Sequence, residues 1–410
     1  MRNKQKYEFS GINQKICLNS FKTPLYAYLQ LNTNCNFKCK FCSREKMANR
    51  SIDYIDFKYV INILSKVGIK DIYITGGEPL LHPKIDDMIE YALTKKMSIS
   101  ILTNGFYIDK HVELLKKVAC LSVSLHGEKE THNRIVGVKC YDKIINNINL
   151  LLGKVNLTIN YTAFNENINE KDIMAVYNFC DHNKIKMNIS RYNDLGCGKV
   201  NQCDLDLNVF MKTIYELVEK EYDISVNNCI APCVVSPKYL HLCHGCGAGS
   251  IFCAIDYDLN VKICSSASQV MGNLKKQSLN KIWNSKILKT FRGLKWLPIY
   301  CKSCINLARC RGGCRIELGN HLLKLNDKNV HELNENTWKR IKDKKFEVLI
   351  GKVRKEANSF ISLSTPSRLF SKDVLNVLQK IQCNGIISDL EQYKDLILSL
   401  YRDKVIKEKQ

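Results

Sequence analysis

The sequence lacks the segments that would direct the chain into or through a membrane. Its first 15 residues, MRNKQKYEFSGINQK, contain no apolar run of the kind that a signal peptide needs. No window approaches the roughly 18 consecutive apolar residues of a membrane-spanning helix. We therefore expect a cytoplasmic protein without a membrane partner.

Proline is also scarce, with 7 residues in 410, and no low-complexity run is present, which excludes a collagen-like or disordered chain. Hydrophobic residues make up 45% of the chain, enough for a sizeable core, and the length favours two domains. Acidic residues are few, 40 against 62 lysines and arginines, so the formal net charge is +22. Such a charge suits an anionic partner, but the lysines are scattered, which favours a solvated basic surface.

Cysteine, by contrast, is abundant, with 20 residues. A chain in the reducing cytoplasm rarely uses disulfides, so this number of thiols indicates metal binding or catalysis. Most of the cysteines gather in two fields, residues 35–42 and residues 229–314.

Apolar, β-rich runs alternate with stretches of helical spacing over the first half of the chain. Strands are expected at residues 24–32, 71–77, 97–105, 120–127, 155–163 and 185–193. Helices are expected between them, for example over 56–68 and 82–96. Alternating strands and helices predict a parallel α/β sheet. Six units in about 170 residues predict an open or partial TIM-like barrel rather than a closed eight-stranded one.

The polar sequences GGEP, TNG and SLHG stand at the carboxyl ends of expected strands, where parallel α/β folds build their sites. We expect this barrel over residues 24–215, after an extension of residues 1–23. A small cysteine-rich domain stapled by metal is expected over 216–335, and a helical region over 336–410.

Three cysteines, Cys35, Cys39 and Cys42, lie in the stretch NTNCNFKCKFCSREK, directly after the first expected strand. Thiolates select zinc or iron–sulfur clusters, and both usually take four ligands. Three thiolates can hold three irons of a [4Fe–4S] cluster and leave the fourth iron open. A zinc loop that borrows a fourth ligand, or three buried cysteines, is the alternative. Phe41 beside Cys42, and the TGGEP sequence whose Glu78 can receive an ammonium group, favour the open cluster.

The CxxxCxxC spacing and the GGEP sequence resemble the radical S-adenosylmethionine (SAM) enzymes over about residues 24–195. The resemblance implies a partial (β/α)6 barrel, a [4Fe–4S] cluster on the three cysteines, and SAM chelated to the open iron. It places Phe41 by the adenine, and Gly76, Gly77 and Glu78 at the methionine amino group. Its ribose and carboxylate contacts correspond to Asn104, Ser124, Arg134 and Asn160. Two alternatives stay open: Ser124 as a turn serine at the end of a strand, and Arg134 as a plain surface arginine.

An enzyme of this family cleaves SAM reductively, and the resulting 5′-deoxyadenosyl radical abstracts hydrogen from an unactivated C–H bond. The cofactor carries that chemistry, while the protein supplies position and keeps water out. We expect a reductant such as flavodoxin or ferredoxin as a partner. Cys197, in DLGCGKV just past the last expected strand, is a candidate catalytic proton or hydrogen-atom donor.

The second cysteine field has two runs with metal-ligand spacing. CHGCGAGSIFCAIDYDLNVKIC contains Cys243, Cys246, Cys253 and Cys264, and YCKSCINLARCRGGC contains Cys301, Cys304, Cys310 and Cys314. Zinc ribbons are one interpretation. The pattern also resembles the SPASM extension of peptide-modifying radical enzymes, which implies two auxiliary iron–sulfur clusters. The family pattern assigns Cys253, Cys264 and Cys314, with Cys246 or Cys243, to the first cluster, and Cys301, Cys304 and Cys310 to the second.

The chain departs from this pattern in two places. Leu259 stands where the family usually has glycine, and the last cysteine of the family is absent. Asp327 is our candidate for the missing ligand, with His331, an open iron, or a plain loop aspartate as alternatives. Cys229 and Cys233 have no assigned role, and an alternative ligand pair, redox cysteines in the cavity and inert small hydrophobic residues all stay open for them.

Auxiliary clusters suit a substrate that loses an electron after hydrogen abstraction, such as a ribosomally made peptide being crosslinked or oxidised. Only about 23 residues precede the first expected strand, fewer than a winged leader-binding domain of about 80 residues needs. A separate protein or the C-terminal tail would then bind the leader, and an acidic leader would suit the basic surface. Sulfatase maturation ranks lower. Those enzymes have an aspartate directly after the cysteine equivalent to Cys264, whereas this chain has the sequence CSSAS there.

Chemistry on a small molecule or cofactor precursor also stays open. An alternative of another class is a non-catalytic iron–sulfur or zinc scaffold that binds nucleic acid. GGEP would have no purpose in such a scaffold, and no basic helix with interleaved aromatics is visible. Cleavage of SAM by the reduced protein separates the two classes.

Overall fold

The computed structural model describes residues 21–44, 48–227, 229–232, 235–242, 245–294, 296–297, 310–314, 335, 338–349, 353–355, 360–362, 368–370, 372–402 and 406–409. The chain divides into two compact units. The barrel unit comprises Lys22–Asn228 and Ala248–Leu288, and the second unit comprises Met1–Phe21, Cys229–Gly247 and Lys289–Gln410.

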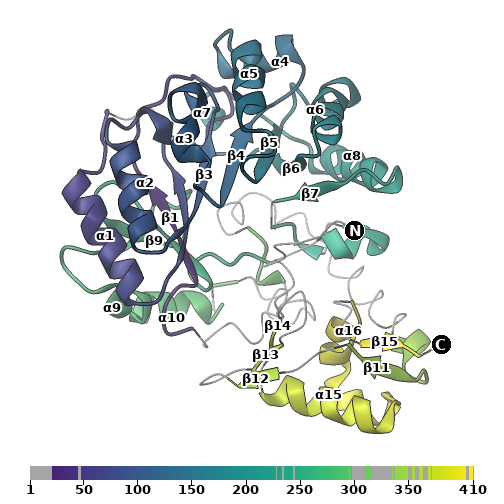
Figure 1. The fold of residues 1–410 in the computed structure, drawn as a ribbon. Coiled ribbons are helices and arrows are strands. Elements are labelled where there is room, and N and C mark those ends of the chain that lie inside the picture. The colour runs from purple at the N-terminus through teal and green to yellow at the C-terminus, as the bar shows by residue number, and fades with distance from the viewer. Residues whose placement is uncertain are drawn as a thin grey trace. The chain divides into compact units, whose positions relative to one another are not determined.

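The barrel unit is built on a ten-stranded sheet in the order β10-β9-β8-β1-β2-β3-β4-β5-β6-β7 (Figure 1). β1 to β7 pair in parallel, β8 pairs in parallel with β1, and β9 and β10 continue the sheet antiparallel. The strands are β1 Tyr26–Gln30, β2 Asp71–Thr75, β3 Ser98–Thr103, β4 Cys120–Ser124, β5 Leu157–Ala163, β6 Lys186–Arg191, β7 Ile224–Val226, β8 Phe252–Ile255, β9 Asn260–Lys262 and β10 Val270–Asn273.

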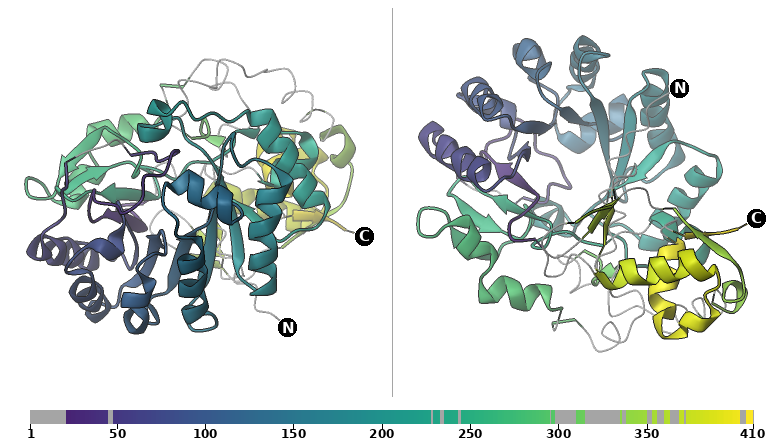
Figure 2. Two further views of the ribbon diagram at one scale, coloured as in Figure 1. Left: turned by 90° about the horizontal axis from the view of Figure 1, so that it is seen from above. Right: turned by 60° about the horizontal axis from the view of Figure 1, so that its bottom comes forward.

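Helices follow the parallel strands and lie in an arc outside them (Figure 2). The main ones are α1 Tyr54–Lys66, α2 Ile85–Thr94, α3 Val112–Leu115, α4 Lys129–Val136, α5 Tyr141–Leu151, α6 Glu170–His182, α7 Gly196–Val200 and α8 Leu207–Glu219, followed by α9 Leu279–Trp283 and α10 Lys286–Arg292. Two short 3-10 helices, η2 Pro79–Leu81 and η3 Ile108–Lys110, follow β2 and β3. The strand-to-helix alternation is what the sequence pattern predicted, and the partial-barrel fold class is confirmed.

The helices form because their apolar residues share one face. In α1, Phe57, Val60, Ile61 and Leu64 are buried at the spacing of one helical stripe, and the Asp53 side chain caps the helix by accepting from the Ile55 N–H. The strands alternate in the same way, since every second residue of β5 from Leu157 to Ala163 is buried. The core therefore lies between the helices and the sheet, and the carboxyl ends of the strands are left to polar loops.

The six strands expected from the sequence correspond to β1 to β6, each shorter than its apolar run. β7 to β10 were missed. They have three or four residues each, too few for an alternating pattern to stand out. The pairing of β8 with β1 joins segments far apart in the sequence, which no local pattern can indicate.

The second unit contains both helices and strands. α15 Lys372–Asn384, α16 Lys394–Arg402 and the 3-10 helix η7 Ser388–Tyr393 agree with the expected helical pattern, and another 3-10 helix, η5 Pro237–Leu242, lies outside the region where helices were expected. The expected helical C-terminal region also contains strands. β11 Phe346–Val348 pairs with β15 Ile406–Glu408, and β12 Val353–Lys355, β13 Phe360–Ser362 and β14 Arg368–Phe370 form a three-stranded sheet. These strands too are only three residues long. No helix in the described part of the chain is long and apolar enough to cross a membrane.

Candidate functional site

The three cysteines of the first field lie on an irregular segment that follows β1, residues 33–44, which we call the cysteine loop. The N–H groups of Lys38 and Lys40 donate to the carbonyls of Val136 and Ile135, at 3.0 Å each. The carbonyls at the end of α4 have no partner within the helix, so they are free to receive these donors. The end of α4 thus holds the two residues on either side of Cys39.

The three thiols are close enough to influence one another electrostatically. Burial raises the pKa of Cys39 well above its ordinary value, and the nearby Cys42 and Cys35 raise it further. Burial also raises the pKa of Cys35, against a hydrogen bond from the Phe37 N–H at 3.5 Å. Within the described residues no three Cys, His, Asp or Glu side chains surround a point suited to one metal ion. Three thiols on one loop are the donor set that a [4Fe–4S] cluster with one open iron takes, so the residues fit that group by the chemistry of their donors.

The two glycines of GGEP bring the loop after β2 against the start of the cysteine loop. A Cβ on Gly77 would lie 1.8 Å from the carbonyl oxygen of Asn34, and one on Gly76 would lie 2.5 Å from Asn32 Oδ1. The Gly77 N–H donates to both the Asn32 backbone oxygen and Asn32 Oδ1 at 2.9 Å. Only glycine permits this approach, so the two loops are held at backbone contact.

Glu78 is buried, and its carboxylate receives three donors from the protein. Oε1 accepts from Thr103 Oγ1 at 2.7 Å and from the Leu80 N–H at 3.0 Å, and Oε2 accepts from the Asn104 N–H at 2.7 Å. Burial nevertheless raises the pKa of Glu78 to about 7. The carboxylate therefore joins the ends of β2 and β3, and the ammonium-binding role expected for it stays a prediction.

Phe41 lies in the cysteine loop and Asn104 borders it, and their expected contacts with SAM stay predictions. The Phe41 ring packs edge-on against His126 with centroids 4.7 Å apart, and lies 5.5 Å from Phe164. Asn104 Nδ2 donates to Asn36 Oδ1 at 2.8 Å and lies 3.9 Å from Cys35 Sγ. An aromatic and an amide thus border the three thiols.

Ser124 and Asn160 face each other in the register of β4 and β5, and Asn160 Nδ2 donates to Ser122 Oγ at 2.7 Å. Arg134 lies on α4, and its side chain is 52% exposed. Its guanidinium pairs with the Glu166 carboxylate at 3.4 Å. Glu166 also receives Lys40 Nζ at 2.9 Å. The Arg134 guanidinium therefore already has an acidic partner, which favours the surface arginine over a cofactor contact.

Two histidines that the sequence analysis left without a role lie beneath Phe41. His126 Nδ1 accepts from the Thr162 N–H at 3.1 Å, and His132 Nδ1 accepts from the His126 N–H at 3.2 Å. Burial lowers the pKa of His126 well below its ordinary value and that of His132 to about 4. Both rings are therefore neutral with hydrogen on Nε2. The polar SLHG sequence at the end of β4 was the available signal for His126, whereas His132 lies beyond it on α4.

One buried acceptor at this edge of the barrel has no hydrogen-bond donor among the residues that the structure describes. Asn193, two residues past β6, has an Oδ1 that is buried without a hydrogen bond among the described residues. Cys197 follows in α7, half-buried, and its N–H donates to the Arg44 carbonyl at 3.0 Å. The segment after β6 thus lies against the exit of the cysteine loop.

In the second field, Cys253 and Cys264 belong to the barrel unit. Cys253 lies on β8 opposite Ala27 of β1, and burial raises the pKa of its thiol to about 12. Gln30 Nε2, at the carboxyl end of β1, donates to the Ser265 carbonyl at 3.1 Å. Cys264 therefore lies at the same edge of the sheet as the cysteine loop.

Other cysteines of this field belong to the second unit. Cys246 and Cys310 are buried, and the Cys314 N–H donates to the Cys229 carbonyl at 3.1 Å. The contact brings Cys229, which sequence reasoning left without a role, beside a predicted ligand. Several predicted or alternative ligands lie outside the described residues: Cys233, Cys243, Cys301, Cys304, Asp327 and His331.

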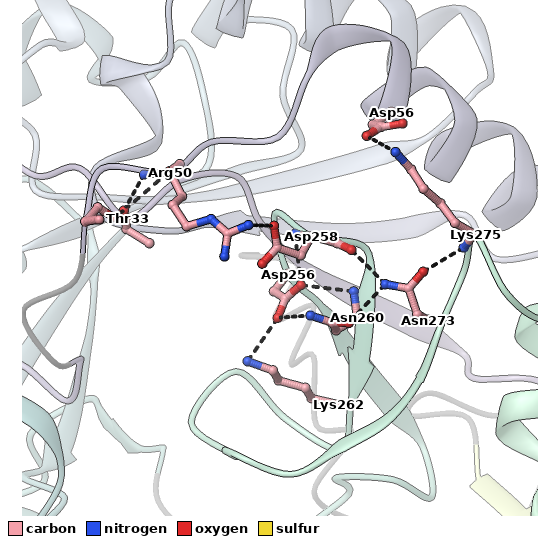
Figure 3. Close-up of polar contacts among 10 residues, drawn as sticks. Thr33, Arg50, Asp56, Asp256, Asp258, Asn260, Lys262, Asn273 and Lys275 are labelled. Atoms are coloured by element: carbon pink, nitrogen blue, oxygen red, sulfur yellow. Dashed lines mark hydrogen bonds and ion pairs between the residues drawn. The ribbon is translucent and has the colours of Figure 1, made fainter.

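The turn between β8 and β9 is held by a polar network (Figure 3). Asp256 Oδ1 accepts from the N–H groups of Asp258 and Asn260, and Asp256 Oδ2 pairs with Lys262 Nζ, each at 3.0 Å. Arg50, just past the cysteine loop, pairs with Asp258 at 2.5 Å. Leu259 has a φ of +64°, which explains why glycine suits this position in the family.

Comparison with known proteins agrees with this geometry. Residues 29–180 match the Radical SAM superfamily, and residues 246–305 match SPASM, an iron–sulfur cluster-binding domain. The PqqA peptide cyclase of Gluconobacter oxydans is 23% identical over 72% of this chain and 86% of its own length. A GTP 3′,8-cyclase of Aliarcobacter butzleri is 29% identical over 38% of this chain, and the match covers only about half, 51%, of that relative.

Two solved structures are similar in fold. Streptococcus suis SuiB, bound to its precursor peptide SuiA, has a TM-score of 0.61 at 20% identity, covering 74% of this chain and 75% of that one. Native anSMEcpe, with bound AdoMet and a Cp18Cys peptide, has a TM-score of 0.57 at 19% identity, covering 77% and 98%. Together with the two matched domains, which imply SAM and iron–sulfur clusters, these findings show that the chain is a radical SAM enzyme with a SPASM domain.

Proposed function

We propose that this enzyme crosslinks or oxidises a ribosomally synthesised peptide. The observation that carries the proposal is the reach of the likeness to the PqqA peptide cyclase, which covers 72% of this chain and 86% of that relative. The GTP 3′,8-cyclase match, in contrast, covers 38% of the chain. SuiB and anSMEcpe, whose structures contain peptides, share the fold over 74% and 77% of this chain.

In this proposal Cys35, Cys39 and Cys42 hold the [4Fe–4S] cluster to which SAM binds. When bound, the cluster and SAM together would supply a reductively formed 5′-deoxyadenosyl radical that removes a hydrogen atom from the peptide. The protein positions the cofactor through Phe41, Gly76, Gly77 and Glu78. Asn104 just after β3, Ser124 at the end of β4 and Asn160 within β5 complete the proposed set. Asn193 Oδ1, a buried acceptor to which no described residue donates, suits the exocyclic amino group of adenine.

A crosslink removes two hydrogens from the peptide. One would leave as a hydrogen atom to the 5′-deoxyadenosyl radical, which becomes 5′-deoxyadenosine, and the other would leave as a proton and an electron. An auxiliary cluster would supply an acceptor for that electron, and we assign two such clusters to the cysteines of the second field and Asp327. Cys197 lies against the cysteine loop, where its thiol would supply or take a proton.

The other parts of the proposal concern partners and boundaries. A flavodoxin or ferredoxin supplies the electron for SAM cleavage, and a separate protein or the C-terminal region binds the peptide leader. The domain boundaries 24–215, 216–335 and 336–410 remain our proposal for the functional modules. A small-molecule substrate is the second candidate, favoured by the GTP 3′,8-cyclase likeness over 38% of the chain.

The test begins with iron. Anaerobically reconstituted protein should contain about twelve irons, and the Cys35/Cys39/Cys42→Ala variant about four fewer. Reduced protein should then form deoxyadenosine from SAM, and a short peptide encoded beside its gene should lose about two mass units per crosslink. Deoxyadenosine without any change in such a peptide, but with turnover of a nucleotide or sugar, would favour the small-molecule alternative.

A further inference from the structure

The sequence DLGCGKVN presents its backbone to the cysteine loop. The Cys197 N–H donates to the Arg44 carbonyl and the Gly198 N–H to the Cys42 carbonyl, both at 3.0 Å. Asn201 Nδ2 donates to the Lys40 carbonyl at 2.8 Å. Three alternate carbonyls of the loop, at residues 40, 42 and 44, therefore each receive one donor from residues 197–201.

This contact leaves no room for side chains at the two glycines that flank Cys197. A Cβ on Gly196 would lie 2.5 Å from the backbone of Ser43 and Arg44, and Gly196 has a φ of +54°. A Cβ on Gly198 would lie 2.4 Å from the Tyr192 ring and 3.1 Å from the Phe41 carbonyl oxygen. Tyr192 is itself buried, so its ring has little freedom to move away.

The opposite side of the loop is held as well, by the end of α4. Because N–H groups of the loop point to α4 and its carbonyls point to residues 197–201, the irregular loop is bonded on both sides, as a strand is within a sheet. A loop held in this way keeps Cys42 and Phe41 in place before any cluster binds.

We propose that residues 196–201 are a positioning clamp for the SAM-binding cluster, and that glycine at 196 and 198 is required for the cluster to be retained in its working geometry. Position 197 contributes its backbone N–H to the clamp, whatever its thiol does. The inference rests on the cluster assignment made above but not on the identity of the substrate. It concerns residues that touch the loop and not the reacting atoms.

The test compares two alanine substitutions that impose the same backbone strain. Gly196→Ala and Gly153→Ala both place an alanine at positive φ, +54° and +71°, but a Cβ at Gly153 meets nothing within 4 Å. The readouts are iron content, the EPR spectrum of the reduced protein, and the change in that spectrum when SAM is added. The auxiliary-cluster signals and the thermal unfolding curve serve as internal references.

We expect Gly196→Ala to lose most of the iron that the triple cysteine variant loses, about four per chain, while the auxiliary signals stay. Gly153→Ala should keep the iron and the wild-type spectrum. Equal retention in both variants, or equal loss in both, would overturn the clamp, because steric contact with the loop would then not matter.

Asn201→Ala keeps the proposal testable if Gly196→Ala does not fold. It removes one hydrogen bond to Lys40 at an exposed position, so the chain should fold and keep its iron. We expect a shifted EPR signal of the SAM-binding cluster and a smaller response to SAM. An unchanged spectrum and response in Asn201→Ala would contradict the clamp. If wild-type and triple-cysteine proteins contain equal iron, the cluster assignment itself fails, which is a different result.

Discussion

The cysteine loop and the β8–β9 hairpin both carry predicted cluster ligands in the barrel unit, yet they are held by different forces. The loop is held by backbone hydrogen bonds and glycine contacts from the GGEP loop, α4 and α7. The hairpin is a regular antiparallel pair whose turn is tethered by charged side chains, among them Asp256, Lys262 and Arg50. Backbone contacts are short, insensitive to salt and intolerant of added atoms. Ion pairs of long side chains act at greater reach, tolerate substitution, and weaken in salt.

This contrast matters for chemistry. A cluster that must chelate SAM in one geometry needs ligands that do not drift, and backbone contact supplies this at about 3 Å. A cluster that only relays electrons tolerates small displacements. If this contrast holds, the cysteine loop is sensitive to added side-chain volume and to acid, whereas the hairpin is sensitive to loss of charge and to salt.

The largest effect is expected from Gly77→Ala. Its Cβ would meet the Asn34 carbonyl oxygen at 1.8 Å, so the two loops must separate. We expect the unfolding free energy to fall by about 3 kcal/mol or more. We also expect the variant to lose the SAM-binding cluster. Urea unfolding and iron content measure this. Gly293→Ala, whose Cβ would have contacts no closer than 3.4 Å, is the matched control and should change neither.

Acid should act next most strongly, through the buried histidine pair beneath the loop. The folded-state pKa of His132, about 4, lies below its ordinary value of 6.5 because the ring is buried. The contribution of the neutral His132 ring to the unfolding free energy is therefore fully present above pH 6.5. It is lost as the pH falls toward 4, which lowers the unfolding free energy by about 3 kcal/mol for this residue alone. Urea unfolding of cluster-free protein from pH 7 to 4 measures the slope. The His132→Gln variant should show a flatter curve, and an equal slope would contradict the assignment.

On the hairpin side, Asp256→Ala should have the largest effect. It leaves Lys262, whose side chain is only 19% exposed, without its carboxylate, and two turn N–H groups without their acceptor. We expect a loss of about 2 kcal/mol. Chemical denaturation measures it, and the iron of the SAM-binding cluster should stay. Loss of that cluster together with the hairpin would show that the two regions are not independent.

The smallest effect is expected from Arg50→Ala. The Arg50 side chain, which forms an ion pair with Asp258, is 52% exposed. The substitution should therefore lower the unfolding free energy by less than about 1 kcal/mol. The cost should nearly vanish in about 1 M salt, where charges are screened within about 3 Å. Unfolding of wild type and variant at low and high salt measures the difference. A cost that persists in high salt would assign the contribution to packing of Arg50 over the Tyr257 ring, 5.3 Å from its centroid.

Much of the barrel could be predicted because its signals are local. Alternating apolar runs marked β1 to β6, and the spacing of Cys35, Cys39 and Cys42 marked the loop. The three- and four-residue strands could not be predicted, since a pattern of period two needs more residues to appear. The Glu166 partner of Arg134 could not be predicted either, because 32 residues separate them and only folding brings them together.

The sequence by itself determined the chemistry available to this protein: two cysteine fields, the GGEP turn, and strands with polar ends that supply a barrel mouth. Those are properties of residue type and spacing, which survive in any conformation. Only the tertiary structure decided which backbones meet. It placed β8 beside β1, DLGCGKVN against the cysteine loop, and two neutral histidines beneath Phe41. The physical reason is that such contacts join segments distant in the chain, and their energies depend on separations of a few tenths of an ångström.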